Sequence, residues 1–304
     1  MAAVNPYHAP VMCAETIESL VTDPHGVYVD ATFGGGGHSA AILQVLDTGG
    51  RLFAFDQDLD AFVNKVDDQR LTLIHGNFRF LKQWMRYYDV THVHGVMADL
   101  GVSSFQLDEK SKGFSYASDA DLDMRMNIKS EASAFQIINE TSEGELVEIF
   151  SRYGEVRNAK TLAKAIVVAR ALRPIKNVQE LLMCIGPLVM GNRSRYLAQV
   201  FQAIRIKVND EIGSLRALLS TAADLLVVGG RLSILTYHSI EDRLVKHFMK
   251  SGKLGPKEQE YEFEEDRKWY LKMLSKKPIL PTREEVGRNR RARSAKLRIA
   301  EKIL

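Results

Sequence analysis

The sequence contains little cysteine and no long hydrophobic run. Cys13 and Cys184 are the only two cysteines in 304 residues, and they lie far apart within apolar helical patterns. This spacing excludes a disulfide framework and a cysteine-based zinc site, and it is typical of a reducing compartment. No apolar stretch reaches the ~18 residues of a membrane span. The N-terminal residues also lack the basic and then apolar order of a secretory signal. We therefore expect a cytoplasmic protein.

The composition excludes two further classes of protein. With 45% hydrophobic and 26% charged residues, the chain lies in the ordinary range of globular proteins and is neither disordered nor fibrous. It has no internal repeat and no low-complexity tract. At ~100–200 residues per domain, its length predicts one large or two modest domains with a substantial core.

Positive charge is concentrated in two segments, although the net charge of the chain is only +3. Residues 151–210 contain eleven Lys and Arg against three Asp and Glu, and residues 281–304 contain eight against three. The rest of the chain therefore has a net charge of −10. This distribution indicates an acidic body with a surface that faces a polyanion, unless the charges only solvate helix faces.

Strand-like and helix-like patterns alternate in the first half of the chain, which is typical of a parallel α/β sheet. The glycine pair Gly229-Gly230 predicts a turn before a late strand. Nearer the C-terminus we expect a loop and a short helix over 252–277, and a last edge strand over 294–299. Core strands are predicted at 27–30, 51–55, 71–75, 93–98 and 231–236, with a helix at 37–46.

About 130 residues separate the last two of these core strands, where a simple βα repeat needs only a few tens. The interval begins with a polar loop, from 101 to 127, and continues with helical patterns but no convincing strand. We therefore predict an α/β domain interrupted by an all-helical one. The predicted boundaries are 1–108 and 205–304 for the α/β domain and 109–204 for the helical, substrate-recognition domain, which carries most of the basic excess.

The strongest local signal is the run Asp30-Ala-Thr-Phe-Gly-Gly-Gly-Gly-His-Ser between the first strand and its helix. Glycines there let the backbone turn tightly and approach a ligand, at the edge where open α/β sheets hold nucleotides. Asp56 follows at the end of the second strand, where it can accept hydrogen bonds from ribose hydroxyls. Together they predict a site for an adenosine cofactor rather than a turn needed only for packing.

The glycine run leaves the identity of that cofactor open. Gly35-x-Gly37-x-x-Ala40 satisfies the looser dinucleotide fingerprint, which keeps an NAD enzyme among the alternatives. S-adenosylmethionine also fits, because its sulfonium is cationic and Asp30 supplies a nearby carboxylate. Since no later segment offers a site for hydride transfer, we favour S-adenosylmethionine.

A second motif, Met97-Ala-Asp-Leu-Gly-Val-Ser-Ser, favours methyl transfer to an amine. The exocyclic amine of cytosine or adenine is a poor nucleophile because its lone pair is delocalised into the ring. A fixed carboxylate that accepts the N–H localises that pair and draws off the developing positive charge. We therefore predict that Asp99 is catalytic, with no metal required, unless it only caps a turn.

Three further side chains follow predicted strands. His38, after the glycines, is predicted to contact the cofactor, and Phe78 either lies against adenine or belongs to the core. His238 leaves the fifth strand at the same edge and is a candidate for substrate contact. Next to it, Ser239 and Asp242 satisfy the pattern of a capping box.

Other candidates face a nucleic acid. In the polar loop, Phe114 could stack on a flipped base and Arg125 could read its edge. The basic positions Arg157, Lys160 and Lys164 of the helical insert, with the strip 288–293, would contact the RNA backbone.

These motifs together resemble the bacterial small-subunit ribosomal RNA (cytosine-N4)-methyltransferase family, RsmH, formerly MraW. The resemblance extends over essentially the whole chain, from His8 to Glu301. The segments that carry it are the Asp30 glycine run, Asp99-Leu-Gly-Val-Ser-Ser with Gln106-Leu-Asp, Gly113-Phe-Ser, Asp121-Leu-Asp-Met-Arg-Met, Phe201-Gln-Ala-Ile-Arg-Ile with Val208-Asn-Asp-Glu, and Gly229-Gly-Arg-Leu-Ser-Ile with His238-Ser.

The resemblance implies a class I, Rossmann-like methyltransferase domain with an inserted helical domain. It implies methyl transfer from S-adenosylmethionine to N4 of one cytidine in the decoding region of 16S ribosomal RNA, within the small ribosomal subunit. Relatives often carry a larger residue at the position of Gly35. The cofactor contacts that carry over are Gly36, Gly37, His38, Asp56, Phe78, Asp99 and Gln106.

Two rival functions remain besides the NAD-linked oxidoreductase. A DNA amino-methyltransferase would share the cofactor site, but such enzymes typically carry an Asp/Asn/Ser-Pro-Pro-aromatic motif where this chain has Asp99-Leu-Gly-Val. A non-catalytic RNA-binding factor for ribosome assembly is the alternative from another class.

Overall fold

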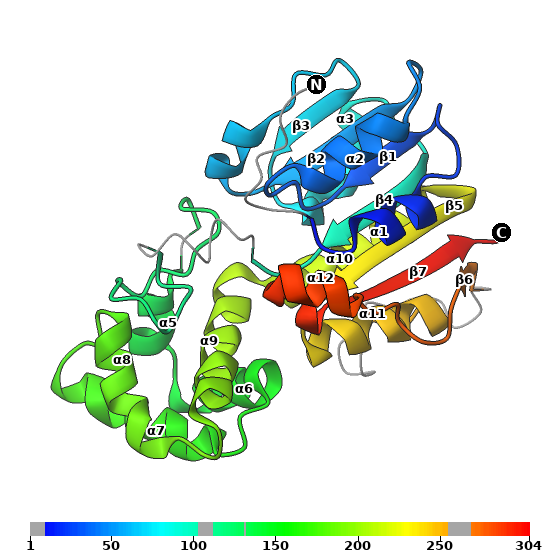
Figure 1. The fold of residues 1–304 in the computed structure, drawn as a ribbon. Coiled ribbons are helices and arrows are strands. Elements are labelled where there is room, and N and C mark those ends of the chain that lie inside the picture. The colour runs from blue at the N-terminus through cyan, green and yellow to red at the C-terminus, as the bar shows by residue number, and fades with distance from the viewer. Residues whose placement is uncertain (1–9, 103–111, 131, 255–268) are drawn as a thin grey trace. The chain divides into compact units, whose positions relative to one another are not determined.

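The structure of the chain divides into two compact units (Figure 1). We call residues 1–101 and 213–304 the α/β unit and residues 102–212 the helical unit. Of the predicted domain boundaries, 108/109 lies outside the described residues, and 204/205 lies within helix α9 (Arg193–Asn209). The structure is a computed structural model that describes residues 10–102, 112–130, 132–254 and 269–304.

A seven-stranded sheet forms the centre of the α/β unit, in the order β3-β2-β1-β4-β5-β7-β6. Strands β1 to β5 run parallel, and β7 runs antiparallel to both of its neighbours. This arrangement confirms the predicted α/β class with a mainly parallel sheet. The strands are β1 (Val27–Asp30), β2 (Arg51–Asp56), β3 (Leu71–His75), β4 (Val93–Asp99), β5 (Leu226–Thr236), β6 (Leu271–Met273) and β7 (Lys296–Lys302).

The core strands are apolar along most of their length because both faces of the sheet are covered. Residues 52–55 of β2 and 95–98 of β4 are all buried. Helix α1 packs on β4, β5 and α2, while α11 packs on β5, β6 and β7 (Figure 1). The helices of this unit are α1 (Cys13–Leu20), α2 (Gly37–Val45), α3 (Leu81–Tyr87), α10 (Glu211–Leu225, which begins at the end of the helical unit), α11 (Ser239–Ser251) and α12 (Arg283–Arg288).

The predicted turn at Gly229-Gly230 is wrong. Strand β5 begins at Leu226 and continues through the glycine pair. The pairing register with β4 shifts there, and the backbone of Gly229 adopts φ +82°. Glycine tolerates this left-handed conformation, so the pair forms an irregularity within a strand rather than a turn before one.

The prediction of an edge strand at the C-terminus is also wrong. Strand β7 lies between β5 and β6, and β6 forms the edge. Strand β6 falls within the region where we expected a loop and a short helix, of which residues 255–268 lie outside the described part of the chain. Three residues are too few for a periodic pattern, which explains why the sequence did not indicate this strand.

The helical unit has its own hydrophobic core. Leu146, Ile149 and Phe150 of α6 are buried in it, as are Leu162 and Ile166 of α7. Helix α7 ends just before an Arg-Pro pair, since proline cannot continue a helix. Helices that lie wholly in this unit are α5 (Ala134–Glu140), α6 (Glu143–Gly154), α7 (Ala159–Leu172), α8 (Val178–Ile185) and α9.

Candidate functional site

The strand order reverses next to β1. Strand β1 connects through α2 to β2 on one side, whereas β4 lies on its other side. Ligands of open α/β sheets bind at the carboxyl ends of the strands at such a switch point. Asp30 ends β1 and Asp99 ends β4, so two carboxylates flank this position.

Only part of the glycine run requires glycine. Gly36 has φ +75°, and a Cβ on it would lie 2.9 Å from the ring of Phe33. A Cβ on Gly37 would lie 2.9 Å from Pro10, whereas one on Gly35 would have no atom within 4 Å. The turn therefore depends on the left-handed backbone of Gly34 (φ +51°) and Gly36, Gly37 lacks room for a side chain beside Pro10, and Gly35 has room for a larger residue.

Asp56 orders the glycine loop from the neighbouring strand. Its Oδ2 accepts a hydrogen bond from the N–H of Gly34 (2.8 Å), and its Oδ1 accepts one from the N–H of Asp58 (2.8 Å). Each oxygen can accept a further donor, because a carboxylate oxygen has two lone pairs. Burial raises the pKa of Asp56 to about 6, despite these hydrogen bonds.

Asp30 is fully buried, and both of its carboxylate oxygens accept hydrogen bonds from groups of the protein. Its Oδ2 accepts from the hydroxyl of Ser39 (2.7 Å) and its Oδ1 from the N–H of Thr32 (3.0 Å). Burial raises the pKa of Asp30. Within the protein this carboxylate joins the glycine loop to the first turn of α2, and a cationic cofactor near it stays a prediction.

Asp99 is held by three neighbours at the end of β4. Its Oδ1 accepts from the hydroxyl of Tyr237 (2.6 Å), and its Oδ2 lies 3.9 Å from Nδ1 of His38. Its backbone N–H donates to Oγ1 of Thr32 (2.7 Å). The side chain is 25% exposed, so it remains accessible from solvent. Burial raises the pKa of Asp99, and the nearby imidazole of His38 opposes that shift.

His38 is a buried side chain whose orientation is set by the N-terminal segment. Its Nε2 lies 3.0 Å from the carbonyl oxygen of Val11. A carbonyl only accepts, so Nε2 carries a hydrogen and Nδ1 faces Asp99. The next residue, Met12, donates its N–H to Oε1 of Glu285 in α12 (2.6 Å) and has φ +49°. Helix α12 thus holds the segment that orients His38.

Replacing Glu285 with Ala should lower the melting temperature of the protein by about 2–4 °C, because it leaves the N–H of Met12 without its acceptor at a cost of about 1 kcal/mol. The Glu285→Gln variant keeps an acceptor oxygen and should melt close to the wild type. Calorimetry on the three proteins measures the difference. Equal melting temperatures for all three would show that this hydrogen bond does not hold the segment.

Phe78 and Gln106 complete the cofactor residues expected from the sequence. Phe78 begins a short 3₁₀ turn (Phe78–Phe80) after β3 and is half-buried, so its ring is not part of the buried core. The turn is held by Asn77, whose amide donates to Gln57 (3.1 Å) and Ser214 (3.2 Å). Gln106 lies outside the described residues.

His238 caps helix α11. Its Nδ1 accepts from the N–H of Glu241 (3.4 Å), and the Glu241 carboxylate accepts from the N–H of His238 (3.4 Å). The capping box predicted for Ser239 and Asp242 therefore begins one residue earlier than expected. Asp242 instead accepts hydrogen bonds from Arg298 (2.6 Å) and Lys296 (3.2 Å) of β7.

The two predictions for the polar loop do not agree with the structure. Phe114 is 7% exposed and packs in the core of the helical unit, so its ring cannot stack on a base without leaving that core. Arg125 is engaged by Asp123 through two of its nitrogens (2.8 and 2.9 Å) and donates to the carbonyls of Ile128 and Ser130. Both side chains stabilise the fold of this segment.

The predicted contacts with the RNA backbone are exposed. Arg157, Lys160 and Lys164 all lie on the surface of the helical unit, in α7 or just before it. The strip at 288–293 is less uniform, because its 3₁₀ turn buries Ala292 while its arginines lie at the surface. Those arginines are Arg288, Arg290, Arg291 and Arg293.

Sequence reasoning did not single out Tyr237 or Thr32, although both bind Asp99. A signal existed for Tyr237, because it directly follows the strand that pairs with β4 and precedes a histidine already under consideration. Burial and the nearby Asp99 carboxylate raise the pKa of Tyr237 far above its ordinary value. The phenol therefore stays protonated and remains a hydrogen-bond donor to Asp99.

The chain is similar to known proteins over its full length. The sequence profile of the MraW methylase family matches residues 5–303. Ribosomal RNA small subunit methyltransferase H of Flavobacterium johnsoniae is 46% identical over 310 residues, which covers 100% of both proteins. The proteins of that name from Flavobacterium psychrophilum and Bacteroides fragilis are 48% and 45% identical, over 96% and 97% of this chain and 100% and 97% of their own. The chain therefore belongs to the MraW methylase family.

Proposed function

We propose that this protein uses S-adenosylmethionine to methylate N4 of one cytidine in the decoding region of 16S ribosomal RNA, within the small ribosomal subunit. Family membership and the names of its relatives support this proposal. The observation that carries it is the Asp99 carboxylate, which stands at the switch point between Tyr237 and His38. Such a substrate would place the protein in the cytoplasm.

The α/β unit has groups that suit S-adenosylmethionine. Gly36 and Gly37 allow the close backbone approach that a side chain would block. The carboxylate of Asp56 suits ribose hydroxyls, and the half-buried ring of Phe78 suits one face of adenine. The carboxylate of Asp99 favours a cationic sulfonium nearby. Bound there, the cofactor would supply an electrophilic methyl group.

Asp99 is suited to hold the amine that accepts the methyl group. Tyr237 fixes Oδ1, which leaves Oδ2 to accept an N–H of the cytosine amine and so localise the nitrogen lone pair. The amine becomes more acidic as it gains the methyl group. Oδ2 can then take its proton, because burial has raised the pKa of Asp99. Nδ1 of His38, 3.9 Å away, can receive that proton next.

The helical unit is proposed to recognise the RNA. Its exposed Arg157, Lys160 and Lys164 can neutralise phosphates, and the arginines of the strip 288–293 can do so from the α/β unit. We no longer assign Phe114 and Arg125 to base recognition, because the fold engages both side chains. His238 remains a candidate for substrate contact at the end of β5.

Cofactor affinity should fall as the pH drops below about 6, because protonated Asp56 loses an acceptor for the ribose hydroxyls. Once Asp56 is largely protonated, the affinity should decrease up to about tenfold for each further pH unit. Calorimetric titration with S-adenosylhomocysteine between about pH 5 and pH 7 measures the effect. The Asp56→Asn variant should bind weakly and without this pH dependence. A flat profile for the wild type, or the same slope in the variant, would contradict the assignment.

A fall in pH has the opposite effect on the stability of the cofactor-free protein, again through Asp56. The pKa of Asp56 is raised in the folded state, so between its ordinary value and about 6 the folded state binds more protons than the unfolded one. The contribution of Asp56 to the free energy of unfolding therefore decreases as the pH rises through this range. A lower pH therefore stabilises the folded protein through Asp56, while it weakens cofactor binding.

The proposed function is tested by methyl transfer from labelled S-adenosylmethionine to small ribosomal subunits and to protein-free 16S RNA. Nucleoside analysis of the labelled RNA should detect N4-methylcytidine at a single position. Label in another nucleoside, or in DNA but not in RNA, would refute the proposed specificity. Cofactor binding without any transfer would instead indicate a binding factor rather than an enzyme.

A further inference from the structure

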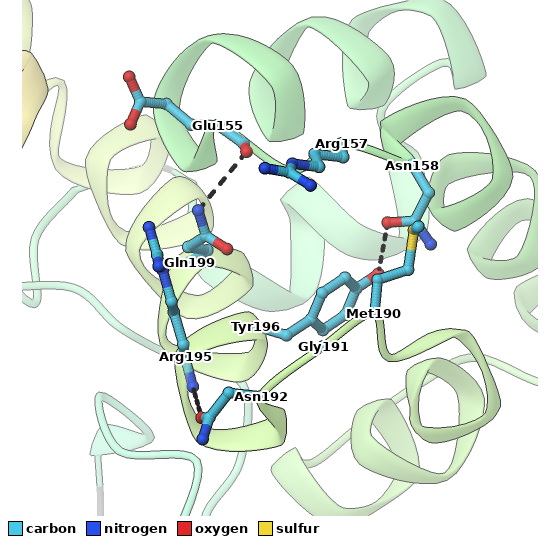
Figure 2. A pocket seen from close by; sticks show the side chains of 9 residues that line it. All are labelled: Glu155, Arg157, Asn158, Met190, Gly191, Asn192, Arg195, Tyr196 and Gln199. Carbon is cyan, nitrogen blue, oxygen red and sulfur yellow. Dashed lines mark hydrogen bonds between the residues drawn. The ribbon is translucent and has the colours of Figure 1, made fainter.

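The helical unit contains a pocket of about 300 Å³ that no step of the proposed reaction uses (Figure 2). It lies between the segment that joins α6 to α7 and the first turns of α9. Most of its lining residues have polar or charged side chains. The lining residues are Glu155, Arg157, Asn158, Met190, Gly191, Asn192, Arg195, Tyr196 and Gln199.

A hydrogen-bonded chain holds one wall of the pocket in place. The hydroxyl of Tyr196, a residue that is 3% exposed, donates to Oδ1 of Asn158 (3.1 Å). The amide of Asn158 in turn donates to the carbonyl of Leu188 (3.0 Å). Both polar groups of Asn158 are thus used within the protein, and this wall is rigid before any ligand binds.

Two guanidinium groups at the pocket have no partner in the described part of the chain. Arg157 and Arg195 are both exposed, and neither side chain makes an ion pair or hydrogen bond with another described residue. Figure 2 shows the carboxylate of Glu155 directed away from Arg157, and the side chain of Arg195 extending along α9. The two guanidinium groups outnumber the one carboxylate at the pocket, so its net charge is positive, which favours an anion.

The remaining groups suit a nucleobase next to that anion. Asn192 uses its Oδ1 to cap α9, where it accepts from the N–H of Arg195 (3.0 Å), so its Nδ2 is left to donate. Gln199 donates from Nε2 to the carbonyl of Glu155 (3.5 Å), so its Oε1 is left to accept. Met190 is 54% exposed and offers an apolar surface to a ring. The edge of a nucleobase presents an acceptor for Nδ2 of Asn192 and a donor for Oε1 of Gln199.

We propose that this pocket binds one nucleotide of single-stranded RNA, with its phosphate against Arg157 and Arg195 and its base against Met190. The inference rests on the proposed function and adds a defined subsite to its RNA surface. A polymer is favoured over a free anion because Arg157 lies just before α7, and Lys160 and Lys164 follow it four residues apart within that helix. This spacing puts the two lysines on one face of α7, so positive charge continues beyond the pocket.

The test compares removal of the two pocket charges with removal of a neighbouring charge. The double variant Arg157→Gln/Arg195→Gln loses both guanidinium groups. The control variant Arg193→Gln removes an exposed charge that lies outside the pocket but in α9, the helix that also carries Arg195. Fluorescence anisotropy with a short labelled oligocytidylate, at several salt concentrations, measures affinity and its salt dependence. Competition with inorganic phosphate and with cytidine monophosphate distinguishes a polymer site from a simple anion site.

We expect the double variant to bind the oligonucleotide roughly 10–100-fold more weakly, with a salt slope smaller by about 0.7 for each phosphate that is no longer neutralised. Arg193→Gln should bind within about twofold of the wild type. Met190→Ala should weaken binding about threefold without changing the slope, because it removes an apolar surface for the base but no charge. S-adenosylhomocysteine should bind all variants equally.

Two results would overturn the inference: equal decreases in affinity for the double variant and for Arg193→Gln, or competition by inorganic phosphate as effective as that by unlabelled oligonucleotide. Parallel methyl-transfer assays separate this proposal from the proposed function. If the wild type modifies its RNA while the double variant retains its affinity and KM, only the pocket is refuted. If the wild type transfers no methyl group but the pocket charges still control RNA binding, only the proposed reaction is refuted.

Discussion

The Asp99→Asn variant is expected to transfer methyl groups roughly 10²–10³-fold more slowly than the wild type. The reason lies in the orientation of the new amide. The hydroxyl of Tyr237 donates to Oδ1 of Asp99, so it would hold the amide oxygen of the variant at that position. The NH₂ group of the amide would then stand where Oδ2 stood, and the cytosine amine would meet a donor instead of an acceptor. Single-turnover methyl transfer to small ribosomal subunits measures the change.

Two controls separate this slower transfer from a folding defect. Asp99→Asn removes a carboxylate whose pKa is raised by burial, so the melting temperature of the variant in mildly alkaline buffer should equal or exceed that of the wild type. Tyr237→Phe removes only the hydrogen bond that fixes Oδ1, and we expect its rate to be about tenfold lower. Near-normal turnover by Asp99→Asn would rule out the proposed role of the carboxylate.

The Gly36→Ala variant is expected to bind S-adenosylhomocysteine at least about tenfold more weakly than the wild type. The backbone of Gly36 has φ +75°, and the added Cβ would lie 2.9 Å from the ring of Phe33 and 3.3 Å from the carbonyl of Asn64. A left-handed conformation costs a non-glycine residue roughly 1–2 kcal/mol, and relief of the close approaches would shift the loop. Because the loop is the proposed cofactor cradle, both effects act on binding.

The matched control is the adjacent residue. Gly35→Ala adds the same methyl group where no atom lies within 4 Å, and the variant should bind S-adenosylhomocysteine within about twofold of the wild type. Calorimetric titration of both variants gives the comparison. Equal affinities for Gly35→Ala and Gly36→Ala would mean that the geometry of the loop does not control cofactor binding.

Several elements could be predicted because their signals are local. The strands at 27–30 and 71–75 have the bounds expected from their apolar runs, and α2 ends within one residue of its predicted end. Asp99 lies at the end of its strand as predicted, and the parallel order puts it beside β1. Because short runs of side chains set the ends of strands, the sequence indicates which residues lie at the carboxyl edge of a parallel sheet.

Other predictions failed where the outcome depended on the packing around a side chain. Phe114 was interpreted as a base-stacking residue, but its ring is buried in the core of the helical unit. Arg125 was interpreted as a residue that reads a base edge, but Asp123 engages its guanidinium. The sequence around an aromatic ring or a charged side chain is the same whether that side chain is engaged within the fold or contacts a ligand. Only the residues that surround it in the structure distinguish the two roles.

The α/β class, the glycine loop and the acids at the strand ends could be predicted from local patterns, because backbone turns and apolar periodicity depend on residues that are adjacent in the chain. The groups that surround those acids are brought together by the fold. Tyr237 reaches Asp99 from 138 positions away, and Glu285 reaches Met12 from 273 away. Contacts of this kind arise from packing the sheet and its covering segments together, so no local pattern encodes them.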